Sequence, residues 1–176
     1  MPSTPLVRPA TAADIPAIAA IYRHHVLHGL ASFELDPPDS DEIARRFIAI
    51  RELGLPYLAA EIDGRLVGYA YASVYRARPA YRYTVEDSVY VDKDHAGLGI
   101  GSGLMPPLIA GCVKAGRRQI IAVIGDSANL GSIRLHEKFG FERVGLLPAI
   151  GFKFGRWVDS VLMQKEVGDG QRSPPD

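Results

Sequence analysis

The chain is poor in cysteine, in net charge and in long apolar runs. One cysteine, Cys112, stands among 176 residues, which excludes an internal disulfide. Twenty Lys and Arg residues balance twenty Asp and Glu residues, so the overall charge recruits neither nucleic acid nor anionic lipid. The apolar runs are too short to span a bilayer, and the first residues lack the pattern of an export signal. We therefore expect a cytoplasmic protein that binds neither nucleic acid nor membranes.

What the sequence does have is the composition of one ordinary globular domain. Hydrophobic residues make up 47% of the chain and charged residues 23%. The length is sufficient for a buried core without disulfides or metals. We place this domain at residues 1–167. The last residues, 168–176, are polar and rich in Pro and Gly, which predicts a disordered tail.

Hydrophobic periodicity predicts an α+β fold with elements in the order βααβββαβαββ. Asp63-Gly64 separates two predicted strands and is a strong signal for a tight hairpin. Pro106 and Pro107 remove two backbone donors from the helix expected after residue 100, which should therefore start late or kink. Strands are expected at 6–9, 56–62, 65–75, 84–92 and 119–124, helices at 11–29, 43–53, 103–116 and 130–139, and two final strands within 141–167.

The stretch 94–105, DHAGLGIGSGLM, places four glycines at alternate positions between a predicted strand and a predicted helix. One or two glycines would suffice for a turn. Glycines at a helix start also let an anion approach the exposed N–H groups, so the loop is a candidate phosphate site. Its spacing matches neither the GxGxxG dinucleotide fingerprint nor a Walker motif.

Three further segments, TVEDSVYV, NLGSIRLHEKFGF and GFKFGRWVD, follow the same order as in a known family. Together with the glycine loop they resemble the GNAT superfamily of N-acetyltransferases, and within it the phosphinothricin and methionine sulfone acetyltransferase group. The resemblance runs from about Val7 to Glu166. It implies a mostly antiparallel central sheet flanked by helices, acetyl-CoA as co-substrate, no metal, and a homodimer.

The resemblance also implies that the glycine loop holds the pyrophosphate of acetyl-CoA through its backbone N–H groups. Ala96 stands where the family usually has Arg or Gln, which should weaken CoA binding. The residues expected to form this cradle are Ala96, Gly97, Leu98, Gly99, Ile100, Gly101 and Ser102.

Acetyl transfer to an amine requires a base, and Glu86 is the candidate. Strand alternation sends Glu86 and Ser88 to one face and Asp87 to the other. The resemblance matches Glu86 to the catalytic glutamate of the family. A carboxylate in a cleft, with its pKa raised by partial burial, can accept the amine proton directly or through a water. The alternative is an exposed strand carboxylate without a catalytic role.

The remaining roles follow from the resemblance. The thioester oxygen is expected at a backbone N–H of Val89 or Tyr90, near a β-bulge, and Val91 is expected to line the cofactor site. Asn129 is expected at the pantetheine arm. His136 stands where many relatives carry tyrosine, and its ordinary pKa of ~6.5 suits an acid that protonates the departing thiolate. The alternative for His136 is packing or hydrogen bonding within its helix.

For the acceptor, the resemblance indicates Arg78, Tyr81 and Phe33. An arginine can grip an α-carboxylate through two parallel donors, which would make the acceptor an amino acid analogue. The alternative is a solvated basic loop around Arg78. Lys153 and Trp157 belong to the signature GFKFGRWVD, whose role is either structural or between subunits.

Histidine and cysteine are two further residue types that could bind a metal or react. His24 and His28 are one helical turn apart, but His25 stands where a zinc protease has glutamate, so we expect no metal. Cys112 has apolar neighbours, which predicts an inert packing thiol.

The sequence thus predicts an acetyl-CoA-dependent N-acetyltransferase that acetylates the primary amine of a small amino acid derivative. Examples are phosphinothricin, methionine sulfone and methionine sulfoximine. Direct attack on the thioester is expected, because Cys112 is far from the catalytic strand in the chain. The alternatives are a peptide N-terminal or polyamine acetyltransferase, and a non-catalytic acyl-CoA-binding sensor.

Overall fold

The computed structural model describes residues 5–175 and confirms the predicted order of elements. Short 3-10 turns at Ala12–Asp14, Pro79–Tyr81 and Lys93–His95 link some of them. The strands are β1 Leu6–Pro9, β2 Tyr57–Ile62, β3 Arg65–Val74, β4 Thr84–Val91, β5 Gln119–Gly125, β6 Glu142–Lys153 and β7 Arg156–Glu166. The helices are α1 Ile15–His28, α2 Ser40–Glu52, α3 Ile100–Lys114 and α4 Leu130–Lys138.

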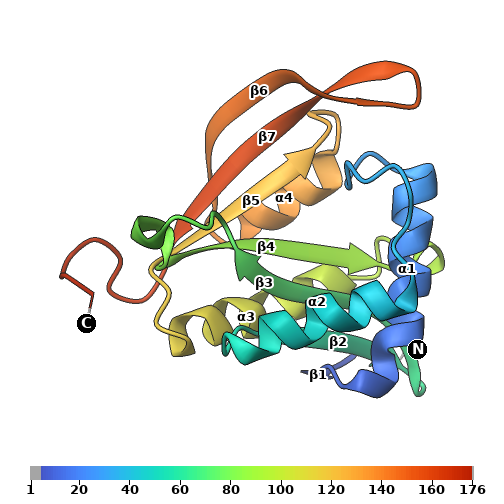
Figure 1. The fold of residues 1–176 in the computed structure, drawn as a ribbon, viewed down its shortest axis with the longest axis horizontal. Coiled ribbons are helices and arrows are strands. Elements are labelled where there is room, and N and C mark those ends of the chain that lie inside the picture. The colour runs from blue at the N-terminus through green and yellow to red at the C-terminus, as the bar shows by residue number, and fades with distance from the viewer. Residues whose placement is uncertain (1–4, 176) are drawn as a thin grey trace.

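The strands form one seven-stranded sheet in the order β1-β2-β3-β4-β5-β7-β6. Only β4 and β5 pair in parallel, and the other neighbours are antiparallel. The parallel pairing ends at Asp87 and Ala122, although both strands continue beyond that point. Figure 1 shows β4 and β5 diverging from there. The sheet is therefore split between β4 and β5 over the second half of these two strands.

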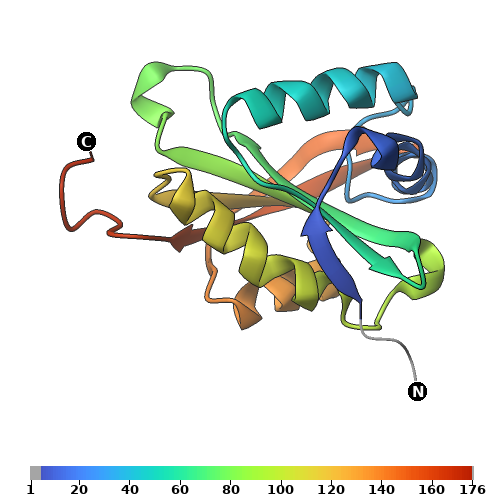
Figure 2. The same ribbon diagram turned by 90° about the horizontal axis from the view of Figure 1, so that it is seen from below.

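The helices cover both faces of this sheet. Figure 2 shows α1 and α2 on one face and α3 and α4 on the other. The apolar stripe of α1 is buried as its spacing predicts, with Ile18 and Val26 wholly inaccessible to solvent. On the opposite face, Leu104 and Leu108 of α3 are buried. Among the described residues, no helix combines the length and the apolar character needed to cross a membrane.

Local turn and cap residues behave as the sequence predicts. Asp63 and Gly64 have φ angles of 50° and 76° and join β2 to β3 in a tight hairpin. Asp39 begins α2 by accepting a hydrogen bond from the backbone N–H of Glu42. Asn129 begins α4 in the same way. These side chains define where the helices that flank the split sheet begin.

The structure corrects two expectations. Helix α3 does not start late, because Gly99, in the left-handed conformation, turns the chain directly into a helix at Ile100, and a kink at the prolines stays a prediction. Pro106 and Pro107 lie inside that helix, which burial of its apolar face stabilises despite the lost donors. The β-bulge expected near Val89 is also absent, since β4 pairs with β3 in unbroken register. The separation of β4 from β5 provides the opening instead.

The C-terminal residues, for which the sequence predicts disorder, form turns next to β5. The side chain of Arg118 donates hydrogen bonds to the carbonyl of Gly170 and to the hydroxyl of Ser173. The backbone N–H of Gln171 donates to the carboxylate of Glu166. These contacts hold part of the segment, at Gly170, Gln171 and Ser173, to the domain, and the predicted disorder of the tail stays a prediction.

Candidate active site

Glycine is needed for different structural reasons at the four positions of the loop. Gly97 and Gly99 have φ angles of 78° and 79°, which side chains rarely adopt. A Cβ atom at Gly101 would lie 3.0 Å from Leu135 of α4, so this glycine permits close packing of α3 on α4. At Gly103 the nearest atom would be 3.8 Å away, which leaves room for a methyl group. Conformation and packing therefore require three of the four glycines.

A cavity of about 560 Å³, which we call the glycine-loop cavity, lies between this loop, α4 and the free part of β4. The first N–H groups of α3 have no acceptors within the helix and carry its positive dipole end. Arg134 and Lys138 of α4 also line the cavity, and Lys138 donates a hydrogen bond to the hydroxyl of Ser102. All of the predicted cradle except Leu98, which is 56% exposed, lines the cavity.

Sequence reasoning missed the two basic residues of α4. Arg134 and Lys138 are spaced i, i+4 and therefore share a helix face. Their side chains bring positive charge to the cavity that Ala96 also lines. The spacing is visible in the sequence, but the approach of this face to the glycine loop is not.

A second cavity of about 290 Å³, the central cavity, lies at the opening between β4 and β5. Glu86, Asp87 and His136 all line it. It meets the glycine-loop cavity, because both are lined by Ala31, Val89, Tyr90, Asn129 and Ser132. A ligand in one cavity can therefore extend into the other.

Glu86 and Asp87 project to opposite sides of β4, as alternation predicts. Burial raises the pKa of Glu86 to about 7, and the charge of neighbouring Asp87 adds to the rise. Among the described residues, Glu86 has no hydrogen-bond or ion-pair partner. A half-buried carboxyl with this pKa exchanges its proton near neutral pH, which is what a general base requires.

His136 is buried on the other side of the strand, with 4% of its surface exposed. Its Nε2 lies 2.9 Å from a carboxylate oxygen of Asp87, and its Nδ1 lies 2.7 Å from the backbone oxygen of Ser132. Burial acts to lower the pKa of His136, but the Asp87 carboxylate outweighs it and the pKa is raised. Both ring nitrogens are thus occupied by protein acceptors.

The loop between α1 and α2, residues 29–39, forms the outer wall of the central cavity. Ser32 is buried, with its hydroxyl 2.8 Å from the hydroxyl of Tyr22 and its carbonyl accepting from the ammonium of Lys153 at 2.6 Å. Phe33 lies against Gly125 and Gly151, where a Cβ atom would approach its ring to 3.0 Å and 2.5 Å. Two segments far apart in the sequence therefore hold this wall.

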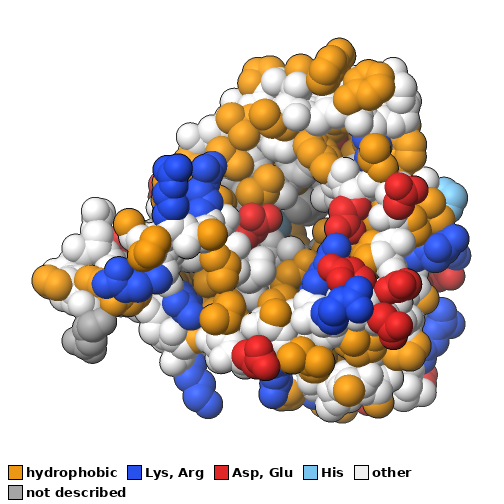
Figure 3. Space-filling model, in the orientation of Figure 1, with side chains coloured by type: hydrophobic (Ala, Val, Ile, Leu, Met, Phe, Trp, Pro, Cys, Tyr) orange, Lys and Arg blue, Asp and Glu red, His pale blue; other side chains and the backbone are white. Residues whose placement is uncertain are grey.

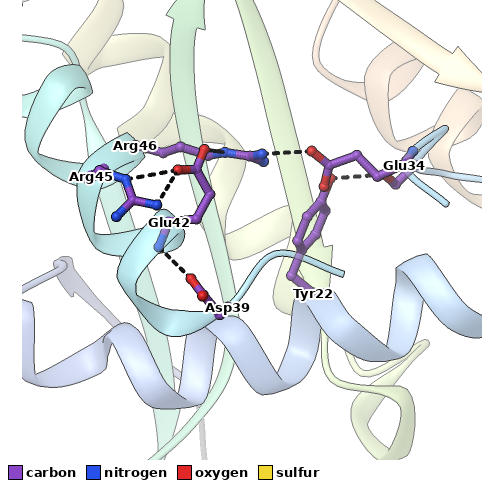
Figure 4. A network of polar contacts seen from close by, with 7 residues as sticks. Tyr22, Glu34, Asp39, Glu42, Arg45 and Arg46 are labelled. Carbon is purple, nitrogen blue, oxygen red and sulfur yellow. Dashed lines mark hydrogen bonds and ion pairs between the residues drawn. The ribbon is translucent and has the colours of Figure 1, made fainter. Parts of the chain in front are cut away.

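An ion-pair network anchors the same loop to α2 (Figure 4). Arg46 donates to Glu34 and to Glu42, each at 2.8 Å. Arg45 donates to Glu42 at 3.0 Å, and Asp39 caps the helix beneath them. Because the loop is held at Ser32 and at Glu34, Phe33 between them has a fixed position beside the cavity.

The structure does not bring the other two predicted acceptor residues to the central cavity. Arg78 and Tyr81 lie on the link between β3 and β4 and line a separate cavity of about 220 Å³. The ring of Tyr81 contacts Tyr75, with the guanidinium of Arg76 nearby. Of the predicted acceptor residues, only Phe33 and Glu86 share the central cavity.

The histidines of α1 and Cys112 make packing and hydrogen-bond contacts within the fold. His25 donates from Nε2 to the carbonyl of Val91 at 2.8 Å, and the rings of His24 and His28 lie 4.9 Å apart. Among residues 5–175, no three His, Cys, Asp or Glu side chains are grouped to hold a metal ion. Cys112 is fully buried, and burial raises the pKa of its thiol to about 12.

Comparison with known proteins gives a consistent result. Residues 21–141 match the model of the Acetyltransferase (GNAT) family. Phosphinothricin N-acetyltransferase of Alcaligenes faecalis is 52% identical over 93% of this chain and 83% of its own length. L-methionine sulfoximine/L-methionine sulfone acetyltransferase of Salmonella typhimurium is 39% identical over 93% of this chain and 95% of its own.

Solved structures agree with the sequence relatives. A phosphinothricin acetyltransferase from Sinorhizobium meliloti in complex with acetyl-CoA has a TM-score of 0.95 and 46% identity, covering 98% of this chain and 94% of that one. The match confirms the mixed, mostly antiparallel sheet flanked by helices. With the family model spanning more than half of its length, the chain belongs to the acetyltransferase (GNAT) family.

Proposed function

We propose that this acetyltransferase uses acetyl-CoA to acetylate the primary amine of a small amino acid derivative of the phosphinothricin, methionine sulfone or methionine sulfoximine type. The observation that carries the proposal is the position of Glu86. It lines a cavity that continues into the glycine-loop cavity, and its pKa is raised to about 7. Two relatives named for these acceptors align over nearly the whole chain. A cytoplasmic location belongs to the same proposal.

The residues of the glycine-loop cavity fit acetyl-CoA. Gly97 and Gly99 leave the start of α3 open to phosphate oxygens, and Arg134 and Lys138 add positive charge. Beyond Asp87, no strand of the described residues pairs with β4 on the β5 side, which leaves backbone groups of Val89–Val91 available to a bound pantetheine arm. Acetyl-CoA supplies the acetyl group as a reactive thioester. Asn129, at the junction of both cavities, is placed for its pantetheine arm.

Glu86 is the proposed base. Its carboxylate accepts a proton from the acceptor ammonium, directly or through a water, and leaves a neutral amine that attacks the thioester carbonyl. The N–C bond forms, the C–S bond breaks, and CoA leaves as a thiolate that takes up the proton lost by the acetylated nitrogen. A backbone N–H of Val89 or Tyr90 is the proposed donor to the thioester oxygen. The buried thiol of Cys112 has a raised pKa and lies outside both cavities, which favours direct attack over an acetyl-cysteine.

The acceptor site is proposed at the central cavity, whose volume of about 290 Å³ suits a small molecule. Phe33 forms part of its wall. Arg78 and Tyr81 lie elsewhere in this chain, so a carboxylate clamp by Arg78 stays a prediction. Replacing Arg78 with alanine tests it: a clamp requires a higher KM for the acceptor, with the affinity for CoA unchanged.

The decisive experiment is a thiol-release screen of amino acids and their sulfone, sulfoximine and phosphinate analogues with acetyl-CoA. The Glu86→Gln variant should lose about 100-fold or more in kcat while it still binds CoA, because the loss of a general base costs this much. Glu52→Gln, an exposed carboxylate at the end of α2, is the matched control. Turnover of peptides or polyamines alone would overturn the acceptor class, and CoA binding without any turnover would indicate a sensor.

A homodimer is also proposed. The β6–β7 hairpin carries apolar side chains that are more than half exposed, and Figure 3 shows them gathered over its outer surface. A contiguous apolar surface of this kind is typical of a protein interface. A second copy of the chain is the partner that the resemblance implies. The exposed residues are Val144, Leu146, Ile150, Phe152, Phe154 and Trp157.

A further inference from the structure

The buried pair formed by Asp87 and His136 has a geometry that differs from that of a proton donor to a thiolate. The backbone oxygen of Ser132 can only accept, so Nδ1 of His136 carries a hydrogen at 2.7 Å from it. Nε2 lies 2.9 Å from Oδ2 of Asp87, and this contact raises the pKa of His136, so we take Nε2 to carry a hydrogen as well. With both nitrogens protonated, the ring is an imidazolium.

Both partners are removed from solvent. Asp87 is 7% exposed and His136 is 4% exposed, and the ring of Phe141 lies edge-on to the imidazole at 4.9 Å. The second oxygen of Asp87 has no hydrogen-bond partner among the described residues, and within residues 5–175 His136 is the only ion-pair partner of the carboxylate. A buried carboxylate with one partner depends strongly on that partner carrying a charge.

The place of the pair in the fold suggests its role. Asp87 is the last residue of β4 that pairs with β5, and beyond it the two strands separate. At this point the Asp87–His136 contact joins β4 to α4. The same helix carries Ser132, Arg134 and Lys138 along the glycine-loop cavity. A contact that fixes α4 on β4 therefore also fixes one wall of that cavity.

We infer that Asp87 is a positioning residue: it holds His136 as an imidazolium, and the pair fastens α4 at the point where the sheet splits. The inference rests on the proposed assignment of the glycine-loop cavity to acetyl-CoA. Because both N–H groups of His136 are directed at Asp87 and Ser132, neither is free to protonate a thiolate without first breaking a buried hydrogen bond.

The charge of the ring can be measured on the wild-type protein without any substrate. Nitrogen-15 NMR of labelled histidine should show both ring nitrogens of His136 protonated at pH 7.5. The Asp87→Asn variant should show a neutral ring at that pH, because the opposing charge is gone while the shape is kept. A neutral His136 in the wild-type protein would overturn the inference.

Kinetics separate positioning from acid catalysis. In Asp87→Asn and in His136→Gln, the dissociation constant for CoA should rise roughly tenfold. The double variant should have the same dissociation constant as either single variant, because the two residues act through one contact. The kcat at saturating acetyl-CoA should change far less. Glu137→Gln, on the exposed side of α4, is the control and should leave CoA binding unchanged.

The opposite pattern would overturn the inference. If His136→Gln lost kcat with CoA affinity intact, and an acetyl thioester with a more acidic thiol restored the rate, His136 would be the acid. CoA binding is measured by calorimetry without an acceptor, so this result does not depend on the proposed amine. A wild-type protein that does not bind CoA would refute the proposed function, while the NMR measurement would still decide the charge of the pair.

Discussion

Glu86 and Asp87 are adjacent in the sequence but have different chemical surroundings. Glu86 has no counterion within residues 5–175, and its pKa is raised to about 7 by burial and then by the charge of Asp87. Asp87 faces the other side of the sheet and pairs with His136. Strand alternation predicts the opposite directions of the two side chains. The pairing is not predictable in the same way, because Asp87 and His136 are 49 residues apart.

The raised pKa of Glu86 predicts a pH dependence of turnover. Below about pH 7 the carboxyl is protonated and cannot act as a base, so kcat should rise as the pH increases through about 7. The profile should be measured with acceptors whose amines differ in pKa. If the apparent pKa of the profile stays near 7 for all of these acceptors, the titrating group belongs to the enzyme. An apparent pKa that changes with the pKa of the acceptor amine would contradict the assignment to Glu86.

The same shift predicts an effect on stability. A carboxyl whose folded pKa of about 7 exceeds its usual value of 4.5 stabilises the fold below about pH 4.5 and loses that contribution as the pH rises through 7. At pH 8 the loss is on the order of 3 kcal/mol. Because glutamine resembles the protonated form, Glu86→Gln should be more stable than the wild type in urea at pH 8 but not at pH 4. Equal stability at both pH values would contradict the shift.

At the scale of elements, the start of α3 shows how a repeated residue can serve separate purposes. Gly97 and Gly99 provide left-handed conformations, while Gly101 allows Leu135 to approach. Gly103 has neither requirement in this chain. An alternating glycine pattern therefore does not mean that each glycine contacts a ligand.

This difference predicts opposite effects of two similar substitutions. Gly99→Ala should lower the free energy of unfolding by about 1 kcal/mol and weaken CoA binding, because alanine disfavours φ near 79°. Gly103→Ala should raise the free energy of unfolding by up to about 1 kcal/mol, because alanine is the better helix former. Urea unfolding and CoA calorimetry measure both effects. Equal effects of the two changes would show that the loop conformation is not the cause.

The sequence predicts elements well where local chemistry determines them. The Asp63-Gly64 hairpin and the caps at Asp39 and Asn129 follow from the conformations and hydrogen bonds of a few neighbouring residues. Pro106 misleads local reasoning, because tertiary burial of α3 outweighs its lost donor. The expected β-bulge was wrong for a related reason: the sheet opens through separation of β4 from β5, which is a property of the whole sheet.

At the scale of the molecule, the split sheet and the apolar hairpin are the main features. The part from β1 to β4 joins the part from β5 to β7 through a short parallel pairing, from Thr84–Gln119 to Asp87–Ala122. The β6–β7 hairpin forms the far edge, where its exposed apolar residues face solvent. An edge of this kind is suited to association with another chain.

The proposed dimer predicts a change in mass. Replacing Trp157, which is 67% exposed, by glutamate should give a monomer in sedimentation velocity, because a charge cannot be buried unpaired at an interface. Ile48→Glu, at a 53% exposed apolar position on α2, is the control and should leave the mass of a dimer unchanged. A wild-type protein that sediments as a monomer would refute the proposal.

The candidate site was only partly predictable at this scale. Glu86 and the glycine loop are recognisable because the residues of each motif are close together in the sequence. Arg134, Lys138 and the contact of Lys153 with Ser32 depend on how separate segments meet. The distance of Arg78 from the central cavity likewise becomes visible only once the link between β3 and β4 is placed in three dimensions.

The bond from Lys153 to Ser32 has a consequence for protein synthesis. It connects residues 121 positions apart, so this support of the outer wall, unlike the contacts with Tyr22 and Arg46, can form only when nearly the entire chain has left the ribosome. The glycine loop and α4 precede that point, so the proposed CoA site can be assembled while the proposed acceptor site still lacks this support. A nascent chain halted before β6 would contain the residues proposed to hold CoA, but its acceptor site would lack this last hydrogen bond.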